Sequence, residues 1–124
     1  MSRVSLMWRY HMTTPGGKLD LLQGTLDVMV LQTLATMGRQ HGYGVARRIE
    51  QQSGDAVVLN QGTIYASLVR LQHRGLISAK WGESDTGRRA KFYTITRRGE
   101  RWLAAEAGEW RRLAAVMGRI LASG

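Results

Sequence analysis

The sequence predicts a mostly α-helical fold with one small β-hairpin, followed by a long C-terminal helix. Apolar residues recur three and four positions apart in several segments, which is the spacing of one face of an α-helix. Two short strand-like runs flank the polar turn S-D-T-G-R-R, which is typical of a hairpin. Helical spacing then returns and continues almost to the end of the chain. This order of elements indicates a winged helix-turn-helix plus a C-terminal dimerisation helix.

The composition bounds the size of the fold and the nature of its partner. The chain has 124 residues, of which 44% are hydrophobic, and this suffices for one domain with one core. Eighteen lysines and arginines stand against nine acidic residues, so the net charge of +9 favours a polyanionic partner. A merely basic surface is the alternative. Because there is no cysteine, neither a disulfide nor a thiolate metal site can form.

Residues 1–18 are predicted to be a flexible N-terminal extension. They lack the long apolar run of a signal peptide, and the segment T-T-P-G-G after Met12 is a turn or linker signal. Met12 is therefore an alternative start, and the residues before it are expected to be poorly ordered. The longest apolar stretch, residues 26–37, is interrupted by polar side chains and is too short to span a bilayer. We expect a soluble, cytoplasmic protein with no membrane partner.

Residues 19–95 are predicted to form the winged helix-turn-helix domain. From Leu19, apolar residues keep helical spacing as far as Gly38, a residue type that commonly ends helices. A second, shorter helix is expected from Tyr43 to near Gly54, because its apolar residues form one stripe while its charged residues face elsewhere. These two helices are expected to supply much of the core.

A third helix is predicted to begin near Gln61 and to stop at Gly75. Ile64, Leu68 and Leu71 fall on one face, which we expect to be buried. Any surface helix can carry polar residues on its other faces, so the basic hairpin that follows is what favours a DNA-binding interpretation here. Small or hydrogen-bonding side chains that suit close approach to a DNA groove are Thr63, Ala66, Ser67 and Arg70, of which Arg70 can bind a phosphate or a guanine.

The predicted hairpin is basic between Lys80 and Lys91. An arginine at a hairpin tip is suited to enter a minor groove or to contact backbone phosphates. The segment Ala56–Leu59, which precedes the third helix, is β-branched and too short for a helix. We expect it to be a small strand or an extended connector that pairs with the edge of this hairpin.

Several motifs in a fixed order resemble one family. They are G-Y-G, then Q-G-T-I-Y-x-x-L-x-R-L and G-L-I, then R-R-A-K-F-Y-x-I-T, and together they look like the PadR family of bacterial transcriptional regulators. The resemblance implies a homodimeric winged-helix repressor that binds double-stranded DNA. For Tyr65 the residues leave two roles open, packing or a phosphate contact. The resemblance places near DNA Tyr43, Gln61, Thr63, Tyr65 and Arg70, and places in the wing Arg88, Arg89 and Lys91, with Tyr93 on the returning strand.

Residues 96–124 are predicted to form the C-terminal dimerisation helix. Thr96 is a good N-cap residue, and the helix that follows would be about 40 Å long. Such a helix overhangs so small a domain, and the simplest partner for its apolar stripe is the same helix of a second subunit. A helix folded back on its own core is the alternative. The residues expected at the dimer interface are Leu22, Leu26, Leu103, Trp110, Leu113, Met117 and Leu121.

Trp102 and Trp110 raise the hypothesis of a small aromatic effector. In multidrug-sensing members of the PadR family, aromatic residues at the dimer interface hold flat ligands, so the resemblance implies the same role for these two side chains. An anchoring role at the interface is the alternative, since tryptophan commonly anchors protein contacts.

The sequence carries no motif of an enzyme or of a metal site. His11, His41 and His73 are far apart and lack metal-ligand spacing, so surface or capping roles are expected for them. Neither a dinucleotide fingerprint nor a Walker motif occurs. We expect no catalysis and no cofactor. A winged helix that binds RNA or another protein is the remaining alternative, although a symmetric dimer matches palindromic duplex DNA better.

Overall fold

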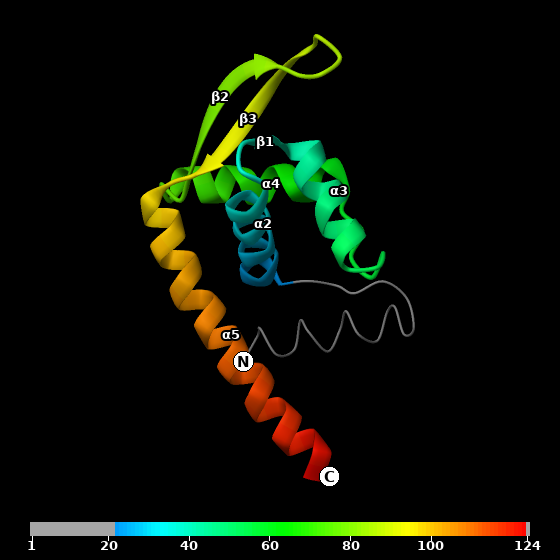
Figure 1. Cartoon of the computed structure of the whole chain (residues 1–124), viewed down its shortest axis with the longest axis vertical. Coiled ribbons are helices and arrows are strands. Elements are labelled where there is room, and N and C mark those ends of the chain that lie inside the picture. Colours follow the sequence, from blue (N-terminus) through cyan, green and yellow to red (C-terminus); the bar gives the residue numbers. More distant parts are fainter. Residues whose placement is uncertain (1–21, 124) are drawn as a thin grey trace.

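The structure, a computed structural model, describes residues 22–123. Three helices form the body of the molecule, the hairpin projects from one end of it, and the last helix runs away from the body (Figure 1). This arrangement confirms the predicted mostly helical winged helix-turn-helix fold. The extension 1–18, the alternative start at Met12 and the expected helix start at Leu19 lie outside the described residues. The elements are α2 (Gln23–Met37), β1 (Gln40–His41), α3 (Gly42–Gln52), α4 (Gln61–His73), β2 (Ile77–Glu83), β3 (Arg89–Ile95) and α5 (Arg97–Ser123).

The helices end where the sequence has residues suited to ending them. Gly38 and Gly75 follow α2 and α4 with positive φ angles of 81° and 73°, a conformation that favours glycine. His41 caps α3, because its Nδ1 accepts the N–H of Gly44 at 2.9 Å. The side chain of Asn60 caps α4 in the same way. These local contacts fix where α3 and α4 begin.

The small sheet is antiparallel and has the strand order β1-β3-β2. In the hairpin the register runs from Ile77 opposite Ile95 to Glu83 opposite Arg89. Gly87 has a φ of 81° in the turn that joins the two strands. The turn and the start of β3 project beyond the body of the molecule (Figure 1).

The prediction that Ala56–Leu59 pairs with the hairpin is wrong, because the third strand is β1. Of the two possibilities, a small strand or an extended connector, the segment is the connector. Val57 is buried in the core, and its N–H donates to Ser53 Oγ at 3.0 Å, while the N–H of Leu59 donates to Glu50 Oε2 at 3.2 Å. Side chains from the end of α3 and from the residue after it therefore accept these two backbone N–H groups, which a neighbouring strand would otherwise have bound.

The core lies between α2, α3 and α4 and includes Ile64, Leu68 and Leu71, as predicted. Two residues expected at a dimer interface belong to this core instead. Leu26 is 4% exposed and Leu103 is 7% exposed. The reason is that the first turns of α5 pack against α2 within one chain. A helix folded back on its own core is therefore a correct description of the start of α5.

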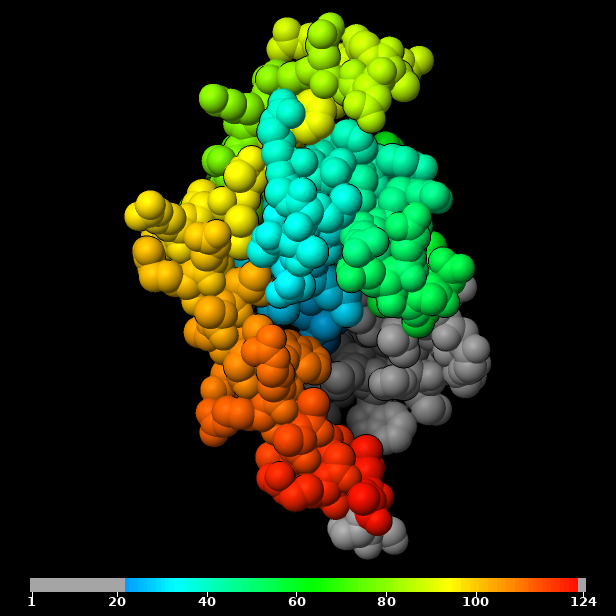
Figure 2. All heavy atoms as spheres, in the orientation of Figure 1, coloured from blue at the N-terminus to red at the C-terminus, as the bar shows by residue number. Residues whose placement is uncertain are grey.

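The remainder of α5 has no such cover. Every described side chain after Gly108 is exposed, and the helix extends beyond the body in Figures 1 and 2. Its large exposed apolar side chains are Trp110, Leu113, Val116, Met117, Ile120 and Leu121. None of the helices within residues 22–123 is long and apolar enough to cross a membrane.

Candidate nucleic-acid interface

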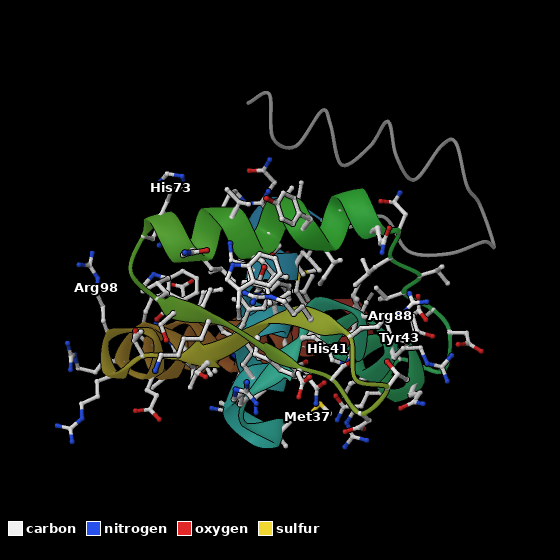
Figure 3. The ribbon with its side chains drawn as sticks, turned by 90° about the horizontal axis from the view of Figure 1, so that it is seen from above. Met37, His41, Tyr43, His73, Arg88 and Arg98 are labelled. Carbon is white, nitrogen blue, oxygen red and sulfur yellow. The ribbon has the colours of Figure 1, made fainter. Side chains whose placement is uncertain are left out.

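An open groove of about 960 Å³ lies between α4 and the hairpin. Its walls come from the N-terminal ends of α3 and α4 and from both hairpin strands. Figure 3 shows His41, Tyr43 and Arg88 at the same end of the molecule, and all three line the groove. No residue that lines it is acidic. The structure brings six of the predicted DNA contacts together in this groove, namely Tyr43, Gln61, Tyr65, Arg88, Arg89 and Lys91.

The hairpin side of the groove is cationic and carries an aromatic residue that sequence reasoning missed. Trp81 of β2 is exposed and stands opposite Lys91 in the sheet register. The guanidinium carbon of Arg89 lies 5.4 Å from the centroid of the Trp81 ring, within the range of a cation–π interaction. The signal in the sequence was a tryptophan in a strand-like run beside a basic turn. This contact orients Arg89 along the groove wall.

The base of the hairpin is anchored on both faces of β3. On one face, the Arg39 guanidinium carbon lies 3.9 Å from the centroid of the Phe92 ring. A Cβ atom on Gly82 would meet that guanidinium and the edge of the Phe92 ring, so a larger residue here would have to displace the flexible Arg39 side chain. On the other face Tyr93 is buried, and burial, followed by the charge on Tyr65, raises the pKa of the Tyr93 phenol. Tyr93 therefore remains a neutral hydrogen-bonding group at physiological pH.

The buried carboxylate of Asp27 contacts two α4 residues that were predicted to bind DNA. The prediction for Ser67 is wrong, and the role of Arg70 is changed. Ser67 has 0% exposure, and its Oγ donates to Asp27 Oδ1 at 2.6 Å, so it cannot reach DNA. Arg70 donates to Asp27 through two nitrogens, at 2.8 Å and 3.3 Å. Its side chain is 28% exposed, and its first role is to pair with this charge. The signal for the network was an aspartate inside the apolar pattern of α2.

The remaining residues predicted for α3 and α4 are accessible. Tyr65 is 59% exposed, which excludes the packing role that the sequence left open for it. Tyr43 is also exposed and lies 6.3 Å from His41, measured between ring centroids. Thr63 is exposed but does not line the groove. DNA contacts by these side chains stay predictions.

Comparison with known proteins assigns the chain to a family. A model of the "Transcriptional regulator PadR-like family" matches residues 30–105, which include most of α2, all of α3, α4 and the sheet, and the start of α5. The chain belongs to this PadR-like family. It is accordingly a DNA-binding transcription regulator and not an enzyme.

Two solved structures of transcriptional regulators and a curated protein are similar over most of their length. A transcriptional regulator from Clostridium thermocellum is 26% identical, with a TM-score of 0.69 over 78% of this chain and 93% of that one. A PadR family regulator from Clostridium difficile is 28% identical, with a TM-score of 0.68 over 77% and 96% of the two chains. An "Uncharacterized protein X" from Lysinibacillus sphaericus is 29% identical over 91 residues, which is 73% of this chain and 83% of that protein.

The two tryptophans suggested for an effector lie in different surroundings. Trp102 is half-buried against the core, and the Arg74 guanidinium carbon lies 4.7 Å from the centroid of its ring. Trp110 is 44% exposed on the part of α5 that leaves the body. Eight positions separate them, or about 12 Å along a helix axis, so they do not form one ring pair within a chain.

Proposed function

We propose that this PadR-like regulator is a homodimeric repressor that binds an inverted-repeat operator. The observation that carries the proposal is the basic groove beside α4, which contains cationic wing residues and no acidic ones. In a two-fold dimer, the two copies of α4 would enter successive major grooves about 34–36 Å apart. Bound at an operator that overlaps a promoter, the dimer blocks RNA polymerase.

The wing and α4 have separate tasks in this proposal. Arg88, Arg89 and Lys91 contact phosphates and supply most of the affinity, which does not depend on base sequence. Side chains of α4, with Gln61 and Thr63 at its N-terminal end, meet base edges and supply most of the discrimination. Because α4 and the hairpin pack together in one domain, with β1 paired to β3, base reading and backbone contact occur together.

The exposed second half of α5 supports the dimer. An apolar helix face of this length is unfavourable in water, and a second copy of the same face covers it in a closed two-fold arrangement. Trp110, Leu113, Met117 and Leu121 form the interface in this proposal, and half-buried Leu22 adds to its edge.

A gel-shift assay tests the operator proposal. The full chain is titrated on the duplex upstream of its own gene and on a scrambled duplex, and light scattering gives its mass. We expect a dimer that shifts the upstream duplex at lower concentration and reduces transcription from that promoter in vitro. A monomer indifferent to both duplexes would contradict the proposal and favour an RNA-binding or protein-binding module.

A planar apolar effector is the finer part of the proposal. Such a compound would stack on the Trp110 rings at the proposed dimer interface and change the angle between the two subunits. We expect it to quench tryptophan fluorescence and to weaken operator binding in the same concentration range. A screen of planar aromatic compounds in which neither signal changes would contradict an effector role.

A further inference from the structure

The face of α4 that points away from the core begins with two small residues and carries no arginine, lysine or acidic side chain. Gly62, Ala66, Val69 and His73 are spaced four, three and four residues apart, which places them on one side of a helix. Gly62, Ala66 and His73 are exposed and Val69 is half-buried. Figure 3 shows His73 pointing away from the hairpin. This outward face is the part of α4 that would meet the floor of a major groove.

The arginine within α4 and the one at its C-cap are already engaged. Within α4, Arg70 is the only arginine and there is no lysine, and Arg70 is held by Asp27 at 2.8 Å. Arg74, which caps the helix C-terminus, lies over the ring of Trp102. Arginine or lysine bound to guanine is the commonest specific contact in the major groove. The outward face of α4 therefore lacks a free arginine or lysine, the side chains that most commonly read guanine.

The side chains on the outward face of α4 match a base other than guanine. Thymine is the only base that presents a methyl group in the major groove, and alanine and similar apolar side chains contact that methyl group. Glutamine is suited to bind adenine through two hydrogen bonds, and Gln61 is exposed at the start of the same helix. Together these groups match A·T pairs.

Nothing in the fold demands a small residue at the start of this face. A Cβ atom on Gly62 would approach only the Asn60 side chain, at 3.4 Å, and no core atom. Packing therefore does not explain the glycine at position 62. Small residues there let the helix backbone come close to base edges.

We propose that Ala66 is a specificity-determining residue that contacts a thymine 5-methyl group, so that α4 selects A·T pairs at the centre of each half-site. The inference rests on the proposed function, in which α4 enters the major groove. It adds which bases α4 selects and which side chain makes the choice.

The test begins with the full chain and a pool of random duplexes, from which bound sequences are selected. We expect A·T pairs to be enriched in the half-sites. Each thymine in a selected duplex is then replaced by deoxyuridine, which removes only the methyl group. Loss of one buried methyl contact should weaken binding about fourfold. The salt dependence of binding should not change, because the phosphates are the same.

A variant of the protein tests whether Ala66 is the residue that contacts the methyl group. Ala66→Ser should reduce the difference between thymine and deoxyuridine duplexes toward zero at one position, since a hydroxyl gains nothing from the methyl group. Ala104→Ser, at an exposed position of α5, is the matched control and should keep the full difference. Half-sites enriched in G·C, or an unchanged affinity for every deoxyuridine duplex, would overturn the inference while leaving DNA binding intact. Failure to enrich any sequence would instead count against the proposed function.

Discussion

Asp27 is the buried charge that joins α2 to α4. Its carboxylate accepts hydrogen bonds from Ser67 and Arg70, and its own side chain is 5% exposed. A buried carboxylate is costly unless its partners are in place, so the free energy of the fold depends on how α4 is rotated against α2. At the scale of single residues, this network orients the face of α4 that we propose to read DNA.

We expect Arg70→Met to lower the free energy of unfolding by about 2–3 kcal/mol, because it leaves the Asp27 carboxylate without its cation. The partial exposure of Arg70 keeps the loss below that of a fully buried pair. Urea unfolding followed by circular dichroism measures it. In an Asp27→Leu background the same substitution should cost much less. An equal cost in both backgrounds would show that Arg70 does not act through Asp27.

Arg88 and Thr63 should differ in how they affect DNA binding. Arg88→Ala is expected to weaken binding on matched and scrambled duplexes alike and to lower the salt-dependence slope by about 1, since one phosphate contact is lost. Thr63→Ala should chiefly alter site preference. Titrations at several salt concentrations measure both effects, and Arg111→Ala on α5 is a control of equal charge. Equal losses for Arg88→Ala and Thr63→Ala on both duplexes would refute this division of tasks.

At the scale of elements, α5 begins in close contact with the residues that follow α4 and continues into solvent. Thr96 Oγ1 donates to the carbonyl oxygen of Gly75 at 2.8 Å and accepts the N–H of Gly99 at 3.0 Å, which confirms it as the N-cap. A Cβ atom on Gly99 would collide with the carbonyl oxygen of Leu76, whereas one on Gly108 would meet nothing within 4 Å. Close packing therefore requires a glycine at position 99, whereas packing within the chain would allow a larger residue at position 108.

Alanine at these two positions should shift the stability in opposite directions. Gly99→Ala is expected to lower the free energy of unfolding by at least about 2 kcal/mol, because backbone must move to make room. Gly108→Ala should raise it by about 1 kcal/mol, because alanine favours a helix without a new clash. Thermal unfolding of the two variants provides the comparison. A stabilised Gly99→Ala protein would disprove the close approach of α5 to the end of α4.

At the scale of the whole molecule, the proposed function depends on the coupling of two reading heads in a dimer. One head offers a cationic groove and a short recognition helix, and the net charge of +9 favours DNA of any sequence. Binding two half-sites at once adds affinity without new contacts, provided that α5 holds the heads at the correct spacing. In this proposal the exposed half of α5 is as important for operator selection as the groove.

Met117→Glu should disrupt the proposed dimer, because it places a charge in the apolar face of α5. Operator affinity is expected to fall about a hundredfold through the loss of bivalent binding. Ala115→Glu, on the opposite side of the helix, adds the same charge and should leave both mass and affinity near those of the unchanged protein. Light scattering and gel shifts measure the two quantities. A Met117→Glu protein that remains a dimer would contradict the assigned interface.

Much of the fold was predictable because its signals are local. Helical spacing, the glycines at positions 38 and 75, the polar hairpin turn and the Thr96 cap each act over a few residues. Neighbouring side chains and backbone angles alone favour these features, so they can be read along the chain. The motif resemblance identified the family on the same basis.

The other features depend on contacts between residues that are far apart in the sequence. Periodicity shows that Leu26, Leu103 and Met117 share the spacing of an apolar face, but not that the first two pack within one chain while Met117 is exposed. In the same way, an arginine on α4 suits a phosphate until an aspartate from α2 lies 2.8 Å away. A side chain's role follows from the lowest free energy among all the partners that folding brings within reach. Those partners are set by three-dimensional packing and not by neighbours in the sequence.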